Sequence, residues 1–276
     1  MSVPIRVSHL FRSLDASLIE LLKSLNADEW QAQTVAKLWK VKDVAAHLLD
    51  GNIRTLSIQR DVFFGEQPGD IQSYQDLVTW LNQLNADWVK SSKRISPKVM
   101  ILLHEATSHQ TCTYFESVDL NTKAIFSVAW AGEAESQNWF HIAREYTEKW
   151  LHQQQIRDAV NKPGILNQKY FSPFLETVMR ALPFTFKDID AAVNTAIQVD
   201  VAHEIVDSWF LVKRETGWEL LKEKPALVMA HVQLEGHAAW KLFSKSWRAE
   251  DIRAFVKMEG DQFLGEQVLT LVSFMA

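Results

Sequence analysis

Hydrophobic residues recur at helical spacing through the first half of the chain. Residues 8–25 carry leucines three and four positions apart, which places them on one face of a helix. Ser96-Pro97 is typical of a helix start, with the serine as N-cap and the proline in the first turn. The same periodicity predicts further helices over residues 41–63, 73–94, 97–118 and 134–160, with turn residues GEQPGD at 65–70. Long helices with short connections predict a helical bundle.

The hydrophobic period changes after Lys162-Pro163-Gly164, which is the strongest break in the chain. We therefore expect two domains, residues 1–161 and 165–276. A helix over 172–182 is expected to end before Pro183. The segment ALVMAHVQL alternates like a half-buried strand, and SWFLVKR with GWELLKE predicts a hairpin around Thr216-Gly217. With helices in HAAWKLFSKSW and FLGEQVLTLVSFM, the second domain is predicted to be α+β with a mainly antiparallel sheet.

Composition narrows the class of protein. The 276 residues are 47% hydrophobic and 23% charged, which is typical of a globular protein. The net charge of -5 argues against nucleic-acid binding, because neutralising phosphates needs a dense basic surface. Neither a membrane span nor a secretory signal is recognisable, so we expect a cytoplasmic monomer or homodimer. Cys112 is the single cysteine and is expected to be a small buried hydrophobic residue.

Three side chains in two predicted helices form a candidate metal site. Glu148 and His152 lie four positions apart and so share a helix face, while His47 belongs to an earlier helix. Two imidazoles and one carboxylate suit a first-row divalent ion, and three protein ligands leave one position open. The alternative is that all three are ordinary polar residues on solvated helix faces.

The segments around these residues resemble a known family. WKVKDVAAHLLDG and EKWLHQQQIRDA are similar to the N-terminal domain of mycothiol-dependent maleylpyruvate isomerases, within the wider DinB/YfiT-like group of metal-binding four-helix bundles. VMAHVQLEGHAAWKLFS and GDQFLGEQVLTLVSFMA resemble the small, sterol-carrier-like α/β domain of that family. The resemblance covers nearly the whole chain. It implies a DinB-like four-helix bundle followed by a small α+β domain.

The resemblance also implies a ligand set and cofactors. The metal ligands of the family fall on His47, Glu148 and His152. The implied cofactors are a divalent metal, zinc before nickel or another ion, and a low-molecular-weight thiol held on the metal as thiolate. Many relatives have an acidic residue at the position of Gln155, so the orientation of His152 is an open question. Arg214 and Arg248 are candidates for a catalytic arginine from the second domain.

Other residues near the motifs leave alternatives open. Asp50 and Arg54 follow His47 by one and two turns, where they either bind the cofactor at the mouth of the site or pair with each other on the helix surface. Glu145 shares a stripe with Glu148 and would replace it if the helix were rotated. The remaining histidines are expected to be structural.

These observations support three functional hypotheses. The first is a metal-dependent thiol transferase or isomerase that acts on a small electrophilic substrate. The second is a binding protein that holds a metal and a ligand without turnover. The same ligand set would also serve a metal-dependent hydrolase.

Overall fold

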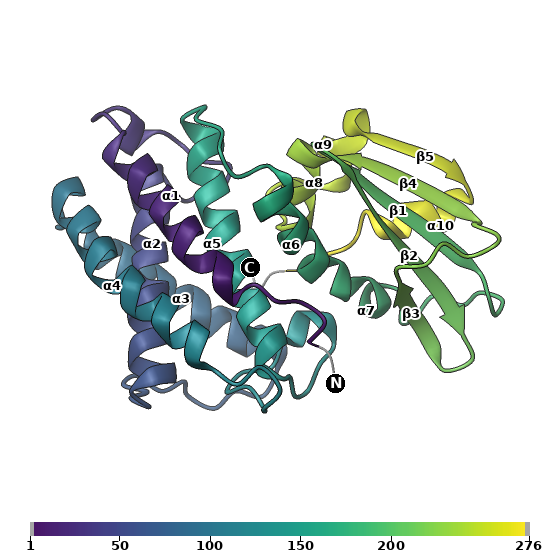
Figure 1. Cartoon of the computed structure of the whole chain (residues 1–276), viewed down its shortest axis with the longest axis horizontal. Helices are drawn as coiled ribbons and strands as arrows, with labels where there is room; N and C mark the ends of the chain where they lie inside the picture. The colour runs from purple at the N-terminus through teal and green to yellow at the C-terminus, as the bar shows by residue number, and fades with distance from the viewer. Residues whose placement is uncertain (1–2, 274–276) are drawn as a thin grey trace. The chain divides into compact units, whose positions relative to one another are not determined.

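The computed structural model describes residues 3–273, which form two compact units (Figure 1). The first unit comprises the described residues up to Ile125 together with Gln137–Ile165, and the second comprises Phe126–Ser136 and the chain from Leu166 onward. Residues 126–136 thus belong to the second unit, although along the sequence they fall between two helices of the first unit. The division into domains 1–161 and 165–276 stays a prediction.

The first unit is helical. Its elements are η1 (Ser8–Leu10), α1 (Phe11–Lys23), η2 (Glu29–Gln31), α2 (Val41–Arg54), the π-helical turn η3 (Thr55–Arg60), α3 (Tyr74–Ser92), α4 (Pro97–Ser117) and α5 (Asn138–Ala159). Helices α1 and α2 each contact both α4 and α5, and α3 packs against α2. Side-chain caps fix two of the starts, because Ser73 accepts from the backbone N–H of Asp76 and Ser96 accepts from that of Val99.

The second unit joins helices to one sheet. Its elements are η4 (Ala129–Ala131), α6 (Gln168–Val178), η5 (Met179–Ala181), α7 (Leu182–Thr185), β1 (Ala196–Ala202), β2 (Val206–Arg214), β3 (Gly217–Leu221), β4 (Ala230–Glu235), α8 (Gly236–Phe243), α9 (Ala249–Ile252), η6 (Arg253–Phe255), β5 (Val256–Gly260) and α10 (Gln262–Val268). The strand order is β3-β2-β1-β4-β5, and only the β1–β4 pair is parallel. Ile197, Val199 and Val201 alternate on the buried face of β1, against which α8 and α10 pack.

The predicted fold class is confirmed: a helical N-terminal region precedes an α+β region with a five-stranded, mostly antiparallel sheet. The hairpin at Thr216-Gly217 forms as predicted between β2 and β3. The sequence pattern missed β1 and β5 and started β4 too early. The helix at 172–182 was also misplaced: α6 ends at Val178, and Pro183 lies in the first turn of α7, where its missing N–H leaves no bond unmade.

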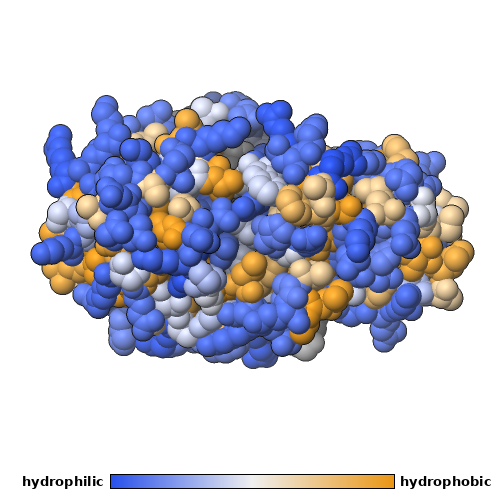
Figure 2. Space-filling model, turned by 90° about the horizontal axis from the view of Figure 1, so that it is seen from above, coloured by the Kyte–Doolittle hydropathy of each residue, from blue (hydrophilic) through white to orange (hydrophobic). Residues whose placement is uncertain are grey.

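Hydrophobic side chains are concentrated in the interiors of the units. On the face shown in Figure 2, hydrophilic residues predominate and hydrophobic residues form small separate patches. Within the described part of the chain, no helix is both long and apolar enough to span a bilayer. The interior of the first unit nevertheless contains several polar groups, among them His104 and Asp15.

We expect the stability of the protein to fall as the pH drops from 6.5 to about 4, because His104 is buried in its neutral form. Burial lowers the pKa of His104 from 6.5 to about 4, although its Nε2–H donates to the carbonyl of Ala45 at 2.9 Å. The unfolded chain therefore takes up a proton at His104 in this range, whereas the folded chain does not. Above pH 6.5 the residue is neutral in both states, so it adds nothing to the pH dependence of the free energy of unfolding.

Chemical denaturation at several pH values tests this expectation. The side-chain N–H of the His104→Gln variant can still donate to Ala45. Between pH 6.5 and about 4, the free energy of unfolding of this variant should fall by up to about 3 kcal/mol less than that of the parent. Equal slopes for the two proteins would contradict the assignment.

Candidate metal centre

Helices α2 and α5 bring His47, Glu148 and His152 together. One candidate ligand atom from each residue lies within 4.8 Å of the others. Glu148 and His152 occupy consecutive turns of α5, and Glu148 Oε2 is 3.4 Å from His152 Nε2. His47 reaches the same point from α2, about one hundred residues earlier in the sequence. The three residues that the sequence selected are therefore neighbours.

His47 is a neutral imidazole in this environment. Burial, with smaller contributions from the charges of His152 and Arg54, moves its pKa well below the ordinary value of 6.5. Its Nδ1 is buried and has no hydrogen-bond partner among the described residues. A neutral ring keeps a lone pair on one nitrogen, and an unpaired buried nitrogen indicates that something outside the chain completes its contacts.

His152 is oriented by Gln155. The Nδ1–H of His152 donates to Gln155 Oε1 at 2.9 Å, and both side chains are buried. Because this bond places the proton on Nδ1, the lone pair lies on Nε2, which faces Glu148. The amide oxygen of Gln155 thus provides the acceptor that a carboxylate would provide. With Gln155 at this position, the ring of His152 therefore has an orienting partner.

Trp39 packs against both histidines, a contact that sequence analysis did not foresee. Its ring centroid is 4.8 Å from that of His47 and 6.0 Å from that of His152. The backbone carbonyl of Trp39 accepts hydrogen bonds from Gln33 Nε2 and Thr34 Oγ1, at 2.9 and 2.7 Å. The loop before α2 is thereby fixed, and with it the indole. In the sequence, the only indication of this contact is that Trp39 lies two residues before the start of α2, the helix that carries His47.

Asp50 and Arg54 form the ion pair that the sequence left open. Arg54 Nε is 3.0 Å from Asp50 Oδ2, and Arg54 also donates to Asn85 Oδ1 at 3.2 Å. Asp50 is only 7% exposed, so the pair is partly enclosed between helices rather than lying free on the surface. Burial raises the pKa of Asp50, and the charge of Arg54 opposes that rise. Since Arg54 also lowers the pKa of His47, its charge reaches the candidate metal site.

Glu145 lies outside the cluster of three. Its carboxylate accepts from Arg144 Nη2 at 2.6 Å and is 3.9 Å from His141 Nε2. Burial acts to raise the pKa of Glu145, but the charges of Arg144 and His141 outweigh it, and the net pKa is lowered. A carboxylate held by an arginine is less available to a metal than Glu148, which has 37% of its side chain exposed.

The other reactive residues are engaged elsewhere. Burial and the charge of Asp15 raise the pKa of Cys112 to about 12, so this thiol stays protonated near neutral pH. Its burial is as predicted, and its Sγ donates to Asp15 Oδ2 at 3.7 Å. In the second unit, His203 and His231 pair with aspartates. Arg214 donates to Glu219 at 3.1 Å.

The donor set fits a small divalent ion. A tetrahedral zinc ion with bonds of about 2.0–2.2 Å needs ligand atoms roughly 3.4 Å apart. Glu148 and His152 already have this separation, and the 4.8 Å limit for the set requires side-chain shifts of about 1 Å. Two imidazole nitrogens and one partly exposed carboxylate suit zinc and other first-row divalent ions.

The comparisons place the chain in a family. A family model described as the mycothiol maleylpyruvate isomerase N-terminal domain matches residues 11–157, which include α1 to α4 and all but the last two residues of α5. Two similar solved structures are a mycothiol-dependent maleylpyruvate isomerase and its histidine-to-alanine mutant. They are 10% and 9% identical to this chain, each with a TM-score of 0.55 and 91% of both chains covered, so the likeness shows a shared fold. Among curated proteins, none matches the chain. Because the family model matches more than half of the sequence, this protein belongs to the mycothiol maleylpyruvate isomerase N-terminal domain family.

Proposed function

We propose that the protein is a metal-dependent thiol transferase or isomerase that uses a low-molecular-weight thiol bound at a divalent ion. One observation carries the proposal: His47, Glu148 and His152 converge within the region that the family model matches. The names of the matching family and of the two solved structures refer to mycothiol and to maleylpyruvate isomerisation. These names support a thiol cofactor and a small electrophilic substrate for this chain as well.

The three residues would hold the ion and leave one side of it open. A divalent ion in this position supplies Lewis acidity, which lowers the pKa of a thiol bound to it. His47 and His152 would contribute imidazole nitrogens, and Glu148 would contribute a carboxylate oxygen. Gln155 fixes the direction of His152, and Trp39 covers the two imidazole rings on one side. We infer zinc first, with nickel or another first-row ion as alternatives.

An external thiol is needed because the chain provides none. Cys112 is buried, its thiol is protonated near neutral pH, and it lies among the helices rather than at the three-residue cluster. Asp50 and Arg54 are proposed to contact the thiol cofactor, because the charge of Arg54 already reaches His47. A guanidinium suits a carboxylate or another anionic group of such a ligand.

Experiments can distinguish the proposed function from two alternatives. A binding protein would hold the metal and a ligand without turnover. A hydrolase would use the same three residues and water instead of a thiol. The exposure of Glu148 does not distinguish the hydrolase from the thiol-dependent enzyme, because it opens the site equally to water and to a thiol.

We expect one divalent ion per chain, bound by His47, Glu148 and His152. His152→Ala should abolish binding, because it removes a nitrogen ligand, whereas Glu145→Ala should leave binding intact because Arg144 holds that carboxylate. Isothermal titration with zinc, checked by elemental analysis of dialysed protein, gives the stoichiometry and the affinity. The reverse behaviour of the two variants would show that Glu145 is the ligand.

Gln155 should tune the affinity without being a ligand. Gln155→Leu removes the acceptor for His152 Nδ1, so we expect zinc affinity to fall roughly 10- to 100-fold. Gln155→Glu restores an acceptor at this position and should keep the parent affinity or exceed it. Identical affinities for the leucine variant and the parent would mean that the packing of Trp39 alone orients the ring.

Turnover should require an added thiol. With metal-loaded protein and electrophilic substrates, activity is expected only with mycothiol, bacillithiol or glutathione present. It should survive Cys112→Ser and disappear in His47→Ala or after chelation. Turnover without any thiol that is still lost on chelation would favour the hydrolase. An absence of turnover with metal bound would favour the binding protein.

A further inference from the structure

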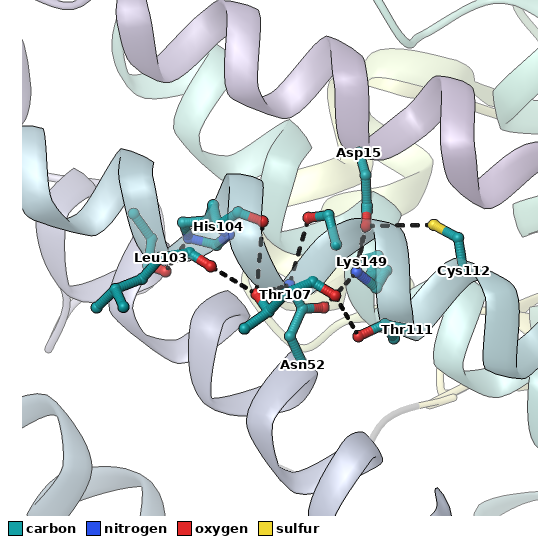
Figure 3. Close-up of polar contacts among 10 residues, drawn as sticks. Asp15, Asn52, Leu103, His104, Thr107, Thr111, Cys112 and Lys149 are labelled. Carbon is teal, nitrogen blue, oxygen red and sulfur yellow. Dashed lines mark hydrogen bonds and ion pairs between the residues drawn. The ribbon is translucent and has the colours of Figure 1, made fainter.

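A buried ammonium group lies directly beside the candidate metal centre. Lys149 follows Glu148 on α5, and Figure 3 shows its side chain directed toward Asp15 of α1 and Asn52 of α2. Its Nζ donates to both carboxylate oxygens of Asp15, at 2.9 and 2.8 Å, and to Asn52 Oδ1 at 2.6 Å. An ammonium has three N–H donors, so this one is fully satisfied by the three oxygens. We refer to Asp15, Asn52 and Lys149 as the ammonium cluster.

The ammonium cluster is enclosed. The side chain of Lys149 is 11% exposed and that of Asp15 is 4% exposed. Screening of this ion pair by water is therefore weak. Three acceptors at fixed distances also leave Nζ little freedom to move. A fully satisfied buried charge of this kind specifies one arrangement of the helices around it.

The cluster connects four helices. Asp15 comes from α1, Asn52 from α2 and Lys149 from α5. The amide of Asn52 continues the network, because its Nδ2 donates to Thr107 Oγ1 on α4 at 3.1 Å. Figure 3 shows these side chains converging between the helices, with the thiol of Cys112 hydrogen-bonded to the carboxylate of Asp15. The hydrogen bonds thus set how far α2 and α5 are shifted along their axes relative to each other.

That shift decides whether the metal ligands meet. His47 lies five positions before Asn52 on α2, while Glu148 and His152 flank Lys149 on α5. A slip of one residue along a helix moves every side chain by about 1.5 Å. Metal–ligand distances tolerate deviations of only about 0.2 Å. Hydrophobic packing alone allows small sliding of helices, whereas a lysine bonded to a residue of the other helix does not.

We propose that Lys149, held by Asp15 and Asn52, is a positioning residue that fixes the register of α5 on α2 and so aligns Glu148 and His152 with His47. The proposal rests on the proposed function, since it concerns the geometry of that metal site. The new element is a role for Lys149, a largely buried side chain that is not one of the three proposed metal ligands.

A positioning role can be separated from a contribution to stability. Replacing both charges of a buried pair by apolar groups of similar volume is often neutral or stabilising, although removing one partner is strongly destabilising. The double variant Asp15→Leu/Lys149→Met therefore removes the hydrogen bonds between α5 and α2 without leaving an unpaired charge. Asn52→Leu is the second variant. It cuts the same link from α2 while the Asp15–Lys149 pair stays intact, and Thr107 keeps its bond to the carbonyl of Leu103.

Arg157 provides a matched control on the same helix. It donates from Nη2 to the backbone carbonyl and Oγ of Ser17 on α1, at 3.1 and 2.8 Å. Like Lys149 it is largely buried, but it lies beyond His152 and bonds to α1 instead of α2. Arg157→Met should lower the denaturation midpoint and leave the metal site unchanged.

The experiment is a titration of the full-length protein with Co²⁺ alone, because the visible spectrum of this ion reports coordination geometry. Circular dichroism first shows that each variant is folded. We expect the double variant and Asn52→Leu to bind Co²⁺ at least about tenfold more weakly than the parent and with an altered spectrum. Arg157→Met should match the parent in both respects.

Each outcome is decisive. A folded double variant or Asn52→Leu protein with the affinity and spectrum of the parent would overturn the positioning role and leave the proposed function standing. If Arg157→Met changes the spectrum as much as the other variants, the effect is general loosening and the proposal fails. If the parent itself does not bind Co²⁺, the proposed metal function fails, and the positioning role fails with it.

Discussion

The alignment of α2 with α5 is the constraint on which the rest of the first unit depends. His47 lies on one of these helices, and Glu148 and His152 lie on the other. Hydrophobic packing brings the helices together, because Ile156 on α5 belongs to the same buried cluster as Val44 and Leu48 on α2. Packing is non-directional, whereas the hydrogen bond from Lys149 Nζ to Asn52 Oδ1 joins the two helices at defined positions.

Burial governs the protonation states inside the first unit. It keeps the imidazole of His47 neutral and the thiol of Cys112 protonated. The first effect suits the proposed role of His47 as a metal ligand, and the second makes Cys112 a poor nucleophile. In the same interior, Asp15 and Asn52 supply three hydrogen-bond acceptors to Lys149 Nζ. The chemistry of each group therefore follows from whether its neighbours replace the water that it has lost.

The elements of the centre have unequal rigidity. His47 and His152 are held by ring contacts with each other and with Trp39, and Gln155 orients His152 further. Glu148 is more exposed and pairs only loosely with His152 at 3.4 Å. Such an arrangement has two fixed nitrogens and one adjustable carboxylate. It allows the carboxylate to follow changes at the open side of an ion without movement of the helices.

Sequence alone determined most of the first unit and the choice of candidate ligands. Leucine periodicity and the cap at Ser96 are local, and the spacing of Glu148 and His152 lies within one helix. Prediction was poorer where partners are distant. The strand β1 lies at the centre of the sheet and was missed, because its identity depends on pairing with β2 and β4.

Only the tertiary structure decided which polar residues face one another. It placed Trp39 on the two imidazoles, and Lys149 on Asp15 and Asn52. A lysine one position after a candidate ligand looks like any solvated helix residue in the sequence. The sequence lists the donors and acceptors, but which of them meet depends on how separate helices pack, and packing involves contacts between residues more than a hundred positions apart.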